Sequence, residues 1–218
     1  MDSGKHKFYI QSGYSGRETS AIAYSYDRSE LSYSAVNEYD GEIVVGSVEF
    51  VEGIIGQRVP DYYPSFSREY FRRNIYWSDS LPESPAFIKP ADRHKRFDAR
   101  IACEDDRYEE KNLGRDFTTG PYWCSDIVWF ENEWRYYVAN GKVLGAWWYS
   151  GPEECDAPEL DIQWPSSFCG AVDFGIVRNK LTLVENNLPY ACGWYGPFEQ
   201  GRVYGEWLEA GWEFIKKL

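Results

Sequence analysis

The sequence predicts an α+β protein that contains more strand than helix, and three observations support this fold class. Beyond residue 86, short apolar segments alternate with turn residues, and two pairs of them have the spacing of β-hairpins. Residues 7–80 instead mix short strands with a helical segment, as in a small α/β lobe. Residues 203–218 place apolar side chains at helical spacing and end in Lys216 and Lys217, which suits the C-terminus of a helix.

The N-terminal part of the chain is predicted to form a lobe of its own. Residues 7–10 and 42–46 have the composition of strands, and residues 65–74 suit a short helix that Ser65 would cap. Residues 78–85 have the composition of a linker or crossing loop. We therefore expect an N-terminal lobe at 1–80 and a second lobe at 81–218.

The second lobe is predicted to be built from antiparallel strands. Apolar runs at 86–89, 126–130, 134–139 and 142–149 suit strands, and Asn140 with Gly141 is typical of a type I′ turn between the last two. A turn centred between these residues pairs Glu133 with Trp148 and leaves Glu133 and Arg135 on one face. The same turn pairs Arg135 with Ala146. The pair on one face is either a surface ion pair or a guanidinium aimed at a phosphoryl group.

Residues 172–187 are predicted to form a hairpin whose two acids oppose each other. If Asn179 is the centre of a three-residue turn, Asp173 lies opposite Glu185, and Asn187 shares their face. Like charges that face each other across strands are destabilising, so removing either acid should relieve repulsion unless a cation lies between them. Two carboxylates and a carboxamide are hard oxygen ligands of the kind that Mg²⁺ prefers. The alternative is a solvated hairpin whose acids merely align.

Composition limits the classes of partner. The net charge of −12 is spread along the chain, which argues against nucleic acid or an anionic membrane as the main partner. The five cysteines form no CxxC pair, and residues 1–7 lack the apolar core of a signal peptide, so we expect free thiols and a cytoplasmic protein. The 10 Trp, 18 Tyr and 12 Phe also fit a sugar-binding β-module, although most of them fall inside strand-like segments. Neither of the two histidines, His6 and His94, is assigned a role.

Several cations stand where they could hold phosphate groups. Lys89 ends an apolar strand, and Pro90 stops the strand there. The loop that follows adds Arg93, Lys95 and Arg96. A lysine at a strand end is most often a surface residue, but it can also extend its ammonium into a cleft.

The order of these motifs along residues 86–190 resembles the ATP-grasp superfamily. A strand-end lysine, a loop lysine, Glu133-Trp134-Arg135, the Asp173 strand and Glu185-Asn186-Asn187 follow one another as in the divergent clade that is named for an arginine and two lysines. The resemblance implies an ATP-grasp-like fold with two lobes built on antiparallel sheets and a reduced N-terminal α/β lobe.

The same resemblance implies a role for each motif residue. Lys89 would contact the α- and β-phosphates of ATP, Lys95 or a neighbouring cation would be the second lysine, and Arg135 would bind the γ-phosphate. Lys89 and Lys95 are only six residues apart, which leaves Arg93 and Arg96 open for the second role. The adenine hinge would lie at 125–128, with Val128 in the hinge and Asp126 at the ribose. Glu133, just after the hinge, would also contact the nucleotide. The metal set would be Asp173, Glu185 and Asn187, holding Mg²⁺.

The function that follows is an ATP- and Mg²⁺-dependent ligase that joins a carboxylate to an amine through an acylphosphate. A peptide or protein is one class of substrate that this reaction would accept. An ATP-binding assembly factor without turnover, or the sugar-binding module, remains the alternative.

Overall fold

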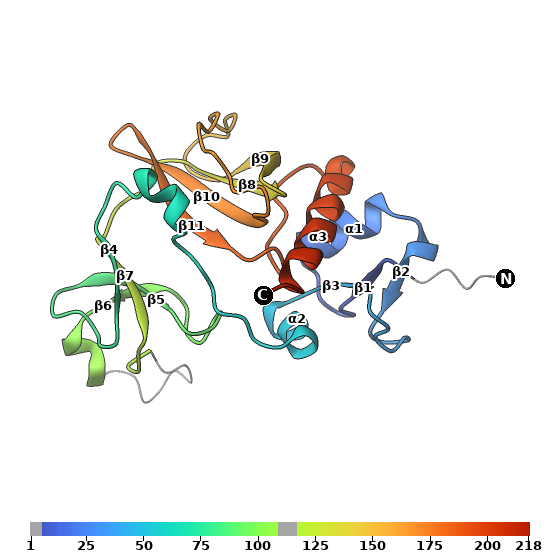
Figure 1. Ribbon diagram of the computed structural model, residues 1–218, viewed down its shortest axis with the longest axis horizontal. Helices are drawn as coiled ribbons and strands as arrows, with labels where there is room; N and C mark the ends of the chain where they lie inside the picture. Colours follow the sequence, from blue (N-terminus) through green and yellow to red (C-terminus); the bar gives the residue numbers. More distant parts are fainter. Residues whose placement is uncertain (1–5, 109–116) are drawn as a thin grey trace.

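The computed structural model describes residues 6–108 and 117–218, and these residues form three sheets (Figure 1). Residues 1–5 of the predicted N-terminal lobe and residues 109–116 of the second lobe lie outside the described part. The first sheet is parallel, has the order β2-β1-β3, and is covered by helices, as the predicted α/β lobe requires. Its elements are β1 (Phe8–Ile10), α1 (Arg17–Ser25), η1 (Arg28–Glu30), β2 (Leu31–Tyr33), β3 (Ile43–Val45) and α2 (Val48–Ile55).

The second sheet is antiparallel and has the order β4-β7-β5-β6. Its strands are β4 (Ile75–Ser78), β5 (Ala86–Pro90), β6 (Arg100–Ala102) and β7 (Tyr122–Ser125), with the 3-10 helices η2 (Ser65–Tyr70) and η3 (Glu104–Tyr108). Strand β4 precedes residue 80 and yet pairs with β7. The division of the chain at residue 80 thus remains a proposal, and the second sheet draws a strand from each side of it.

The third sheet is antiparallel, has the order β11-β10-β8-β9, and is made of two hairpins. Its strands are β8 (Glu133–Ala139), β9 (Lys142–Ser150), β10 (Gly170–Val177) and β11 (Lys180–Asn187), followed by η5 (Phe198–Gln200) and α3 (Gly201–Ile215). The two antiparallel sheets and the small α/β unit together confirm the predicted fold class.

Helix α3 connects the third sheet to the N-terminal unit. Tyr204, Trp207 and Leu208 are buried in one core with Phe8 of β1 and Tyr137 of β8. Figure 1 shows α3 beside α1, at the side of the molecule that carries the parallel sheet. The first and last segments of the described chain therefore support one face of the third sheet.

The opposite face of that sheet packs on a second core. Trp134, Tyr136 and Phe174 point into it and meet aromatic side chains from η2 and its neighbours, including Tyr63 and Tyr70. Because side chains alternate along a strand, burying these residues places Arg135, Asp173 and Glu185 together on the other face.

Three local predictions were wrong. Residues 126–130 are not a strand, because the paired strand ends at Ser125 and the chain then leaves the sheet. Ser65 does not cap a helix: the N-cap of η2 is Pro64, without a side-chain hydrogen bond. The Asn140–Gly141 turn forms, with φ of 49° and 71°, but two register shifts place Arg135 opposite Trp147 and Glu133 opposite Ser150.

Candidate functional site

Three strands of the third sheet bring charged side chains into one row. Asp173 of β10 pairs in register with Arg135 of β8 on one side and Glu185 of β11 on the other. The guanidinium of Arg135 donates from Nε and Nη2 to the two carboxylate oxygens of Asp173, each at 2.7 Å. Asn187 Nδ2 donates to Glu185 Oε1 at 3.0 Å. The acids and the amide that were predicted to share a face do so.

The fourth charge in the row comes from the other antiparallel sheet. Lys89, the next-to-last residue of β5, forms an ion pair with Glu185 Oε2. Its ammonium also lies 4.7 Å from the ring centroid of Tyr62. The Lys89–Glu185 ion pair thus joins the second sheet to the third at one end of the row, and the Lys89 ammonium lies on the same side of the third sheet as the acids.

The register of the acidic hairpin depends on a bulge. The turn has two residues, Arg178 and Asn179, both with positive φ, rather than the three that were predicted. A two-residue turn alone would place Asp173 opposite Val184, but a register shift leaves Val184 unpaired and brings Glu185 opposite Asp173. The predicted pair is confirmed, although its turn is different.

Arg73 holds this bulge from outside the sheet. Its Nη1 donates to the Leu183 carbonyl at 2.5 Å and its Nη2 to the Val184 carbonyl at 3.1 Å. The bulge exposes carbonyl groups that no strand partner uses, and a guanidinium with several donors satisfies them. Sequence reasoning missed Arg73, and no local pattern around it marks the role.

The row is electrostatically paired rather than repulsive. Burial, with Arg73 and Arg135 nearby, lowers the pKa of Lys89 to about 7, although Asp173 acts to raise it. For Arg135, burial opposes the charge, but the adjoining Asp173 carboxylate raises the guanidinium pKa. Each carboxylate has a basic side chain beside it, Arg135 at Asp173 and Lys89 at Glu185, so we now expect removal of Asp173 to cost stability rather than to relieve repulsion.

A cavity of about 640 Å³ lies between the two antiparallel sheets and reaches Lys89 and Glu185 of this row. Its size is that of a small-molecule site. The connection from β7 to β8, which was predicted as an adenine hinge, forms one wall with apolar side chains. The cavity is lined by Arg73, Phe87, Lys89, Arg100, Ser125, Asp126, Ile127, Val128, Trp129, Phe130, Glu133, Tyr149 and Glu185, among others.

The residues predicted to contact the nucleotide occupy different positions around this cavity. Val128 is half-buried in its wall, whereas Asp126 is exposed and its carboxylate accepts the backbone N–H of Asn74 at 3.0 Å. Glu133 accepts the hydroxyl of Tyr149 at 2.8 Å. Glu133 and Arg135 share a face as predicted, but Arg135 is paired with Asp173.

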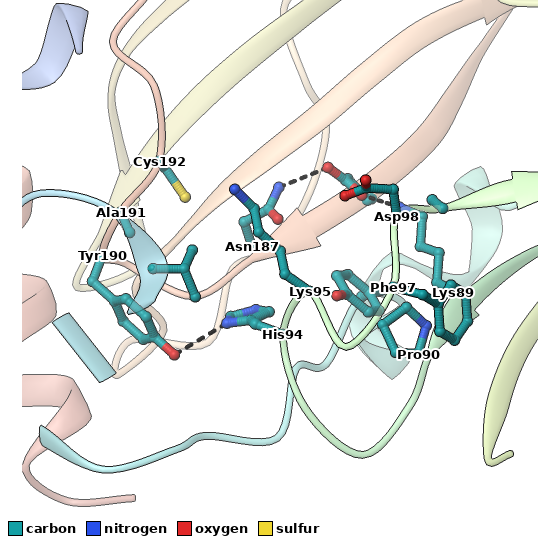
Figure 2. Close-up of a pocket in the computed structure, with 14 residues that line it drawn as sticks. Lys89, Pro90, His94, Lys95, Phe97, Asp98, Asn187, Tyr190, Ala191 and Cys192 are labelled. Carbon is teal, nitrogen blue, oxygen red and sulfur yellow. Dashed lines mark hydrogen bonds and ion pairs between the residues drawn. The ribbon is translucent and has the colours of Figure 1, made fainter. Parts of the chain in front are cut away.

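A smaller cavity of about 210 Å³ continues from the same end of the row, since Lys89 and Glu185 line both. Lys95 and Asn187 also line it, and Figure 2 shows the Lys95 side chain extending across it in the direction of Asn187. Lys95 has φ of 49°, a conformation that costs energy for a residue other than glycine. The loop thus holds this lysine toward the row.

The other two loop cations face elsewhere. Arg96 donates to Asp92 and to the carbonyls of Thr119 and Pro121. Arg93 lines a different cavity, beside Glu49 and Glu52 of α2. Of the three cations left open for the second role, Lys95 is the one that shares a cavity with Lys89, Glu185 and Asn187.

The metal set consists of two carboxylates and one amide. Among residues 6–108 and 117–218, no three His, Cys, Asp or Glu side chains cluster so as to hold a metal ion. Mg²⁺ in nucleotide sites is commonly bound by one or two carboxylates together with phosphate oxygens. Asp173, Glu185 and Asn187 therefore fit a magnesium ion that arrives with a nucleotide, rather than an ion held by protein alone.

Two aromatic residues that the sequence did not mark complete the site. The rings of Tyr149 and Tyr195 stack at 4.8 Å, and the Arg135 guanidinium carbon lies 5.1 Å from the Tyr195 centroid. Tyr195 belongs to the segment after β11, which Arg17 of α1 holds by donating to the Trp194 carbonyl at 2.9 Å. The N-terminal unit thus positions the residues that enclose Arg135.

A cavity between two antiparallel sheets, with Lys89 and Glu185 of the charged row in its wall and the connection from β7 to β8 along one side, is typical of a nucleotide-binding domain of the ATP-grasp type. Residues 68–203 match an ATP-grasp domain family, described as family 2 of the clade named for an arginine and two lysines, and the chain belongs to this family. The matched segment contains every residue of the predicted site. The resemblance drawn from the motifs is confirmed.

Solved structures show a more distant similarity. Two crystal structures of D-alanine–D-alanine ligase from Bacillus anthracis, the first complexed with ATP, have 11% sequence identity to this chain and TM-scores of 0.45 and 0.43. The alignments cover 98% of this chain and 99% and 98% of the two ligase chains. No curated protein sequence matches this chain. In the described residues, no helix is both long and apolar enough to cross a membrane.

Proposed function

We propose that this chain is an ATP- and Mg²⁺-dependent ligase that joins a carboxylate to an amine through an acylphosphate. The observation that carries the proposal is the row Lys89–Glu185–Asp173–Arg135, whose Lys89 and Glu185 line the cavity beside the connection from β7 to β8. The family membership supports ATP as the nucleotide.

The hinge-bordered cavity would take the adenine and ribose, with Val128 against the base and Asp126 and Glu133 at polar positions on its rim. Its walls are mainly apolar and aromatic, which suits a planar base. The phosphates would then extend toward the row, where Lys89 and Lys95 supply positive charge. Lys89 is buried and has a lowered pKa, so an anion beside it would favour its charged form.

The residues of the row would act by position and charge. Arg135 is held by Asp173 and by the two tyrosines, so its guanidinium is preorganised toward a phosphoryl group, and charge that develops during transfer would be stabilised without reorganisation. Asp173, Glu185 and Asn187 would hold Mg²⁺. When bound, the ion would neutralise charge on the phosphate oxygens.

In the reaction, an oxygen of the substrate carboxylate attacks the γ-phosphorus, and ADP leaves with the electron pair of the broken P–O bond. The amine then attacks the acyl carbon, and inorganic phosphate leaves. A peptide or protein as donor or acceptor belongs to this proposal. Lys89 and Asp173 on opposite faces of the sheet would have favoured the sugar-binding alternative, whereas Lys89 pairs with Glu185, the cross-strand neighbour of Asp173.

The test has a binding step and a turnover step. Calorimetric titration with ATP should show binding that requires Mg²⁺ and that weakens at least tenfold in Lys89→Ala. Turnover is then measured as ADP release in the presence of hydroxylamine and a panel of amino acids and short peptides, because hydroxylamine traps an acylphosphate as a stable hydroxamate. Absence of Mg-ATP binding would overturn the proposal. Binding without ADP release or hydroxamate would favour the assembly factor.

A further inference from the structure

His94 forms a carboxylate–histidine pair at the edge of the smaller cavity. Its Nδ1 lies 3.2 Å from Glu52 Oε1 on α2 and 3.1 Å from the Tyr190 hydroxyl, and that hydroxyl donates to the same Glu52 oxygen at 2.8 Å. The side chains of His94 and Glu52 are 8% and 9% exposed. Three separate segments thus meet at one imidazole: α2, the loop after β5 and the segment after β11.

The second ring nitrogen of His94 has no partner. Nε2 is buried and makes no hydrogen bond, which is uncommon for a buried polar atom. His94 lines the cavity of about 210 Å³ together with Lys89, Lys95, Glu185 and Asn187. Figure 2 shows its Nδ1 edge directed at Tyr190, with Lys95 on the same side of the cavity.

The contacts of Nδ1 determine the tautomer. Both of its neighbours accept there, since a carboxylate oxygen has no proton to give and the Tyr190 hydroxyl gives its proton to Glu52. Nδ1 therefore carries the hydrogen, and Nε2 of the neutral ring carries a lone pair. A group that meets this lone pair must donate an N–H or an O–H.

Resting on the proposed ligase function, we propose that the smaller cavity binds the primary amine substrate and that His94 Nε2 accepts the amine's proton. Of the three reactants, ATP phosphates and an ionised carboxylate offer oxygens that accept, whereas the amine offers N–H groups. The Glu52 carboxylate behind His94 favours an arriving cation, and bound phosphate would offset the charge of Lys89 and Lys95, which line the same cavity. This assignment goes beyond the family match, which covers His94 without naming a role for it.

The proton transfers balance in three steps. An ammonium group gives one proton to Nε2, and the imidazolium that forms is stabilised by Glu52. The amine nitrogen then uses its lone pair to form the C–N bond with the acylphosphate carbon. The tetrahedral centre collapses as the C–O bond to phosphate breaks, the phosphate leaves with that electron pair, and the second ammonium proton goes to it. His94 returns its proton to water.

The charges around His94 link this step to nucleotide binding. Burial, followed by Lys95 and Lys89, lowers the pKa of His94 to about 4. Burial raises the pKa of Glu52, while the Tyr190 hydroxyl acts to lower it, and Tyr62 contacts the ring from a fourth segment. Bound phosphate would offset the lowering by the two lysines and leave that by burial, which is the larger cause, so ATP would raise the basicity of the imidazole only in part.

The test uses the full chain and a signal from His94 itself. Because the sequence has two histidines, ¹⁵N-histidine labelling gives two sets of ring signals, and His6→Gln assigns them. The protein, with Mg²⁺ and a non-hydrolysable ATP analogue, is titrated with glycinamide as the amine probe. Propionamide, which lacks the amino group, is the matched control. We expect Nε2 to be the unprotonated nitrogen and to shift with glycinamide but not with propionamide.

Two results would overturn the amine site: Nδ1 found as the unprotonated nitrogen, or an equal response to the two probes, including none. Binding of the ATP analogue, followed by calorimetry on the same sample, tests the proposed function separately. If the ATP analogue does not bind and Nε2 still responds to glycinamide alone, the result supports the amine site and contradicts the ligase function.

Turnover provides a second readout. His94→Asn keeps a donor toward Glu52 and removes the Nε2 lone pair. With any carboxylate that supports hydroxamate formation, we expect this variant to lose roughly 10²-fold or more of amide formation from glycinamide. It should keep hydroxylamine turnover within about threefold, because hydroxylamine is already neutral at pH 7 and needs no base. Equal losses with both nucleophiles would contradict the proton-accepting role.

Discussion

Removing the Asp173 carboxylate should destabilise the protein strongly, even without nucleotide. Asp173 is 1% exposed and accepts two hydrogen bonds of 2.7 Å from the buried Arg135. The guanidinium cannot shed its proton, so the variant leaves a charge that is buried and unpaired. Glu185 provides the comparison, because its partner Lys89 has a pKa of about 7 and can become neutral instead.

The structure allows the size of the effect to be worked out. Breaking a buried pair by removing one partner costs about 3–5 kcal/mol. Asp173→Asn keeps one acceptor oxygen and should lie near the lower end of this range, and Asp173→Ala near the upper end. For a chain of this size, each kcal/mol lowers the melting temperature by roughly 2–4 °C. We therefore expect losses of roughly 6–20 °C for the two Asp173 variants and a distinctly smaller loss for Glu185→Gln.

Thermal unfolding followed by tryptophan fluorescence, in buffer without nucleotide or Mg²⁺, measures these differences. Glu213→Gln is the control, since it removes an exposed carboxylate paired with Lys216, and it should leave the midpoint unchanged. If Asp173→Asn were as stable as the parent, or lost no more than Glu185→Gln, the description of Arg135 and Asp173 as a structural pair would be refuted.

Four further predictions concern nucleotide binding, turnover and pH. Mg-ATP binding at pH 7.5 should take up as much as roughly three-quarters of a proton, because Lys89, with a pKa of about 7, is mostly neutral there and bound phosphate would restore its charge. Calorimetry in buffers of different ionisation enthalpy measures this proton uptake, and an uptake of zero would contradict the prediction. The folded pKa of Lys89 lies below its usual 10.5, so the native state binds fewer protons and stability should rise from pH 7 to 8.5 by up to about 1.4 kcal/mol per unit; Lys89→Met should flatten this slope, and an unchanged slope would exclude Lys89 as its source. Arg135→Lys should lower the rate of ADP release more than ATP affinity, and a larger loss of affinity than of ADP release, by calorimetry and ADP assay, would reassign Arg135. Val128→Trp should fill the larger cavity and abolish ATP binding while the unfolding midpoint is retained, and retained ATP binding would reassign Val128.

Much of the site could be predicted from residue order because its chemistry lies in short motifs. Lys89 lies one residue before the end of a strand, Arg135 follows Glu133 by two positions, and Asp173 opposes Glu185 across one hairpin. These relations depend on strand alternation and turn geometry, which act over a few residues. The family, the fold class and the convergence of the motif residues could therefore be predicted.

Register was harder to predict, because a single unpaired residue shifts it. The bulge that leaves Val184 without a partner compensates for a shorter turn, and the carbonyls it frees are satisfied by Arg73, more than a hundred residues earlier in the chain. The strand expected at 126–130 fails for a related reason: Ser125 ends the pairing of β7, and apolar composition alone cannot report where a partner strand stops.

The sequence by itself determined the local strands and turns, the helical C-terminus and the acidic hairpin, since these follow from side-chain alternation and from the conformations that turn residues adopt. Tertiary structure alone decided which charges are paired and which buried polar atoms, His94 Nε2 among them, lack a partner. Lys89 meets Glu185 because two sheets come together at this point, and His94 meets Glu52 and Tyr190 because three distant segments converge. Burial, which shifts the pKa of Lys89 and His94, is a property of that packing, and no stretch of sequence contains it.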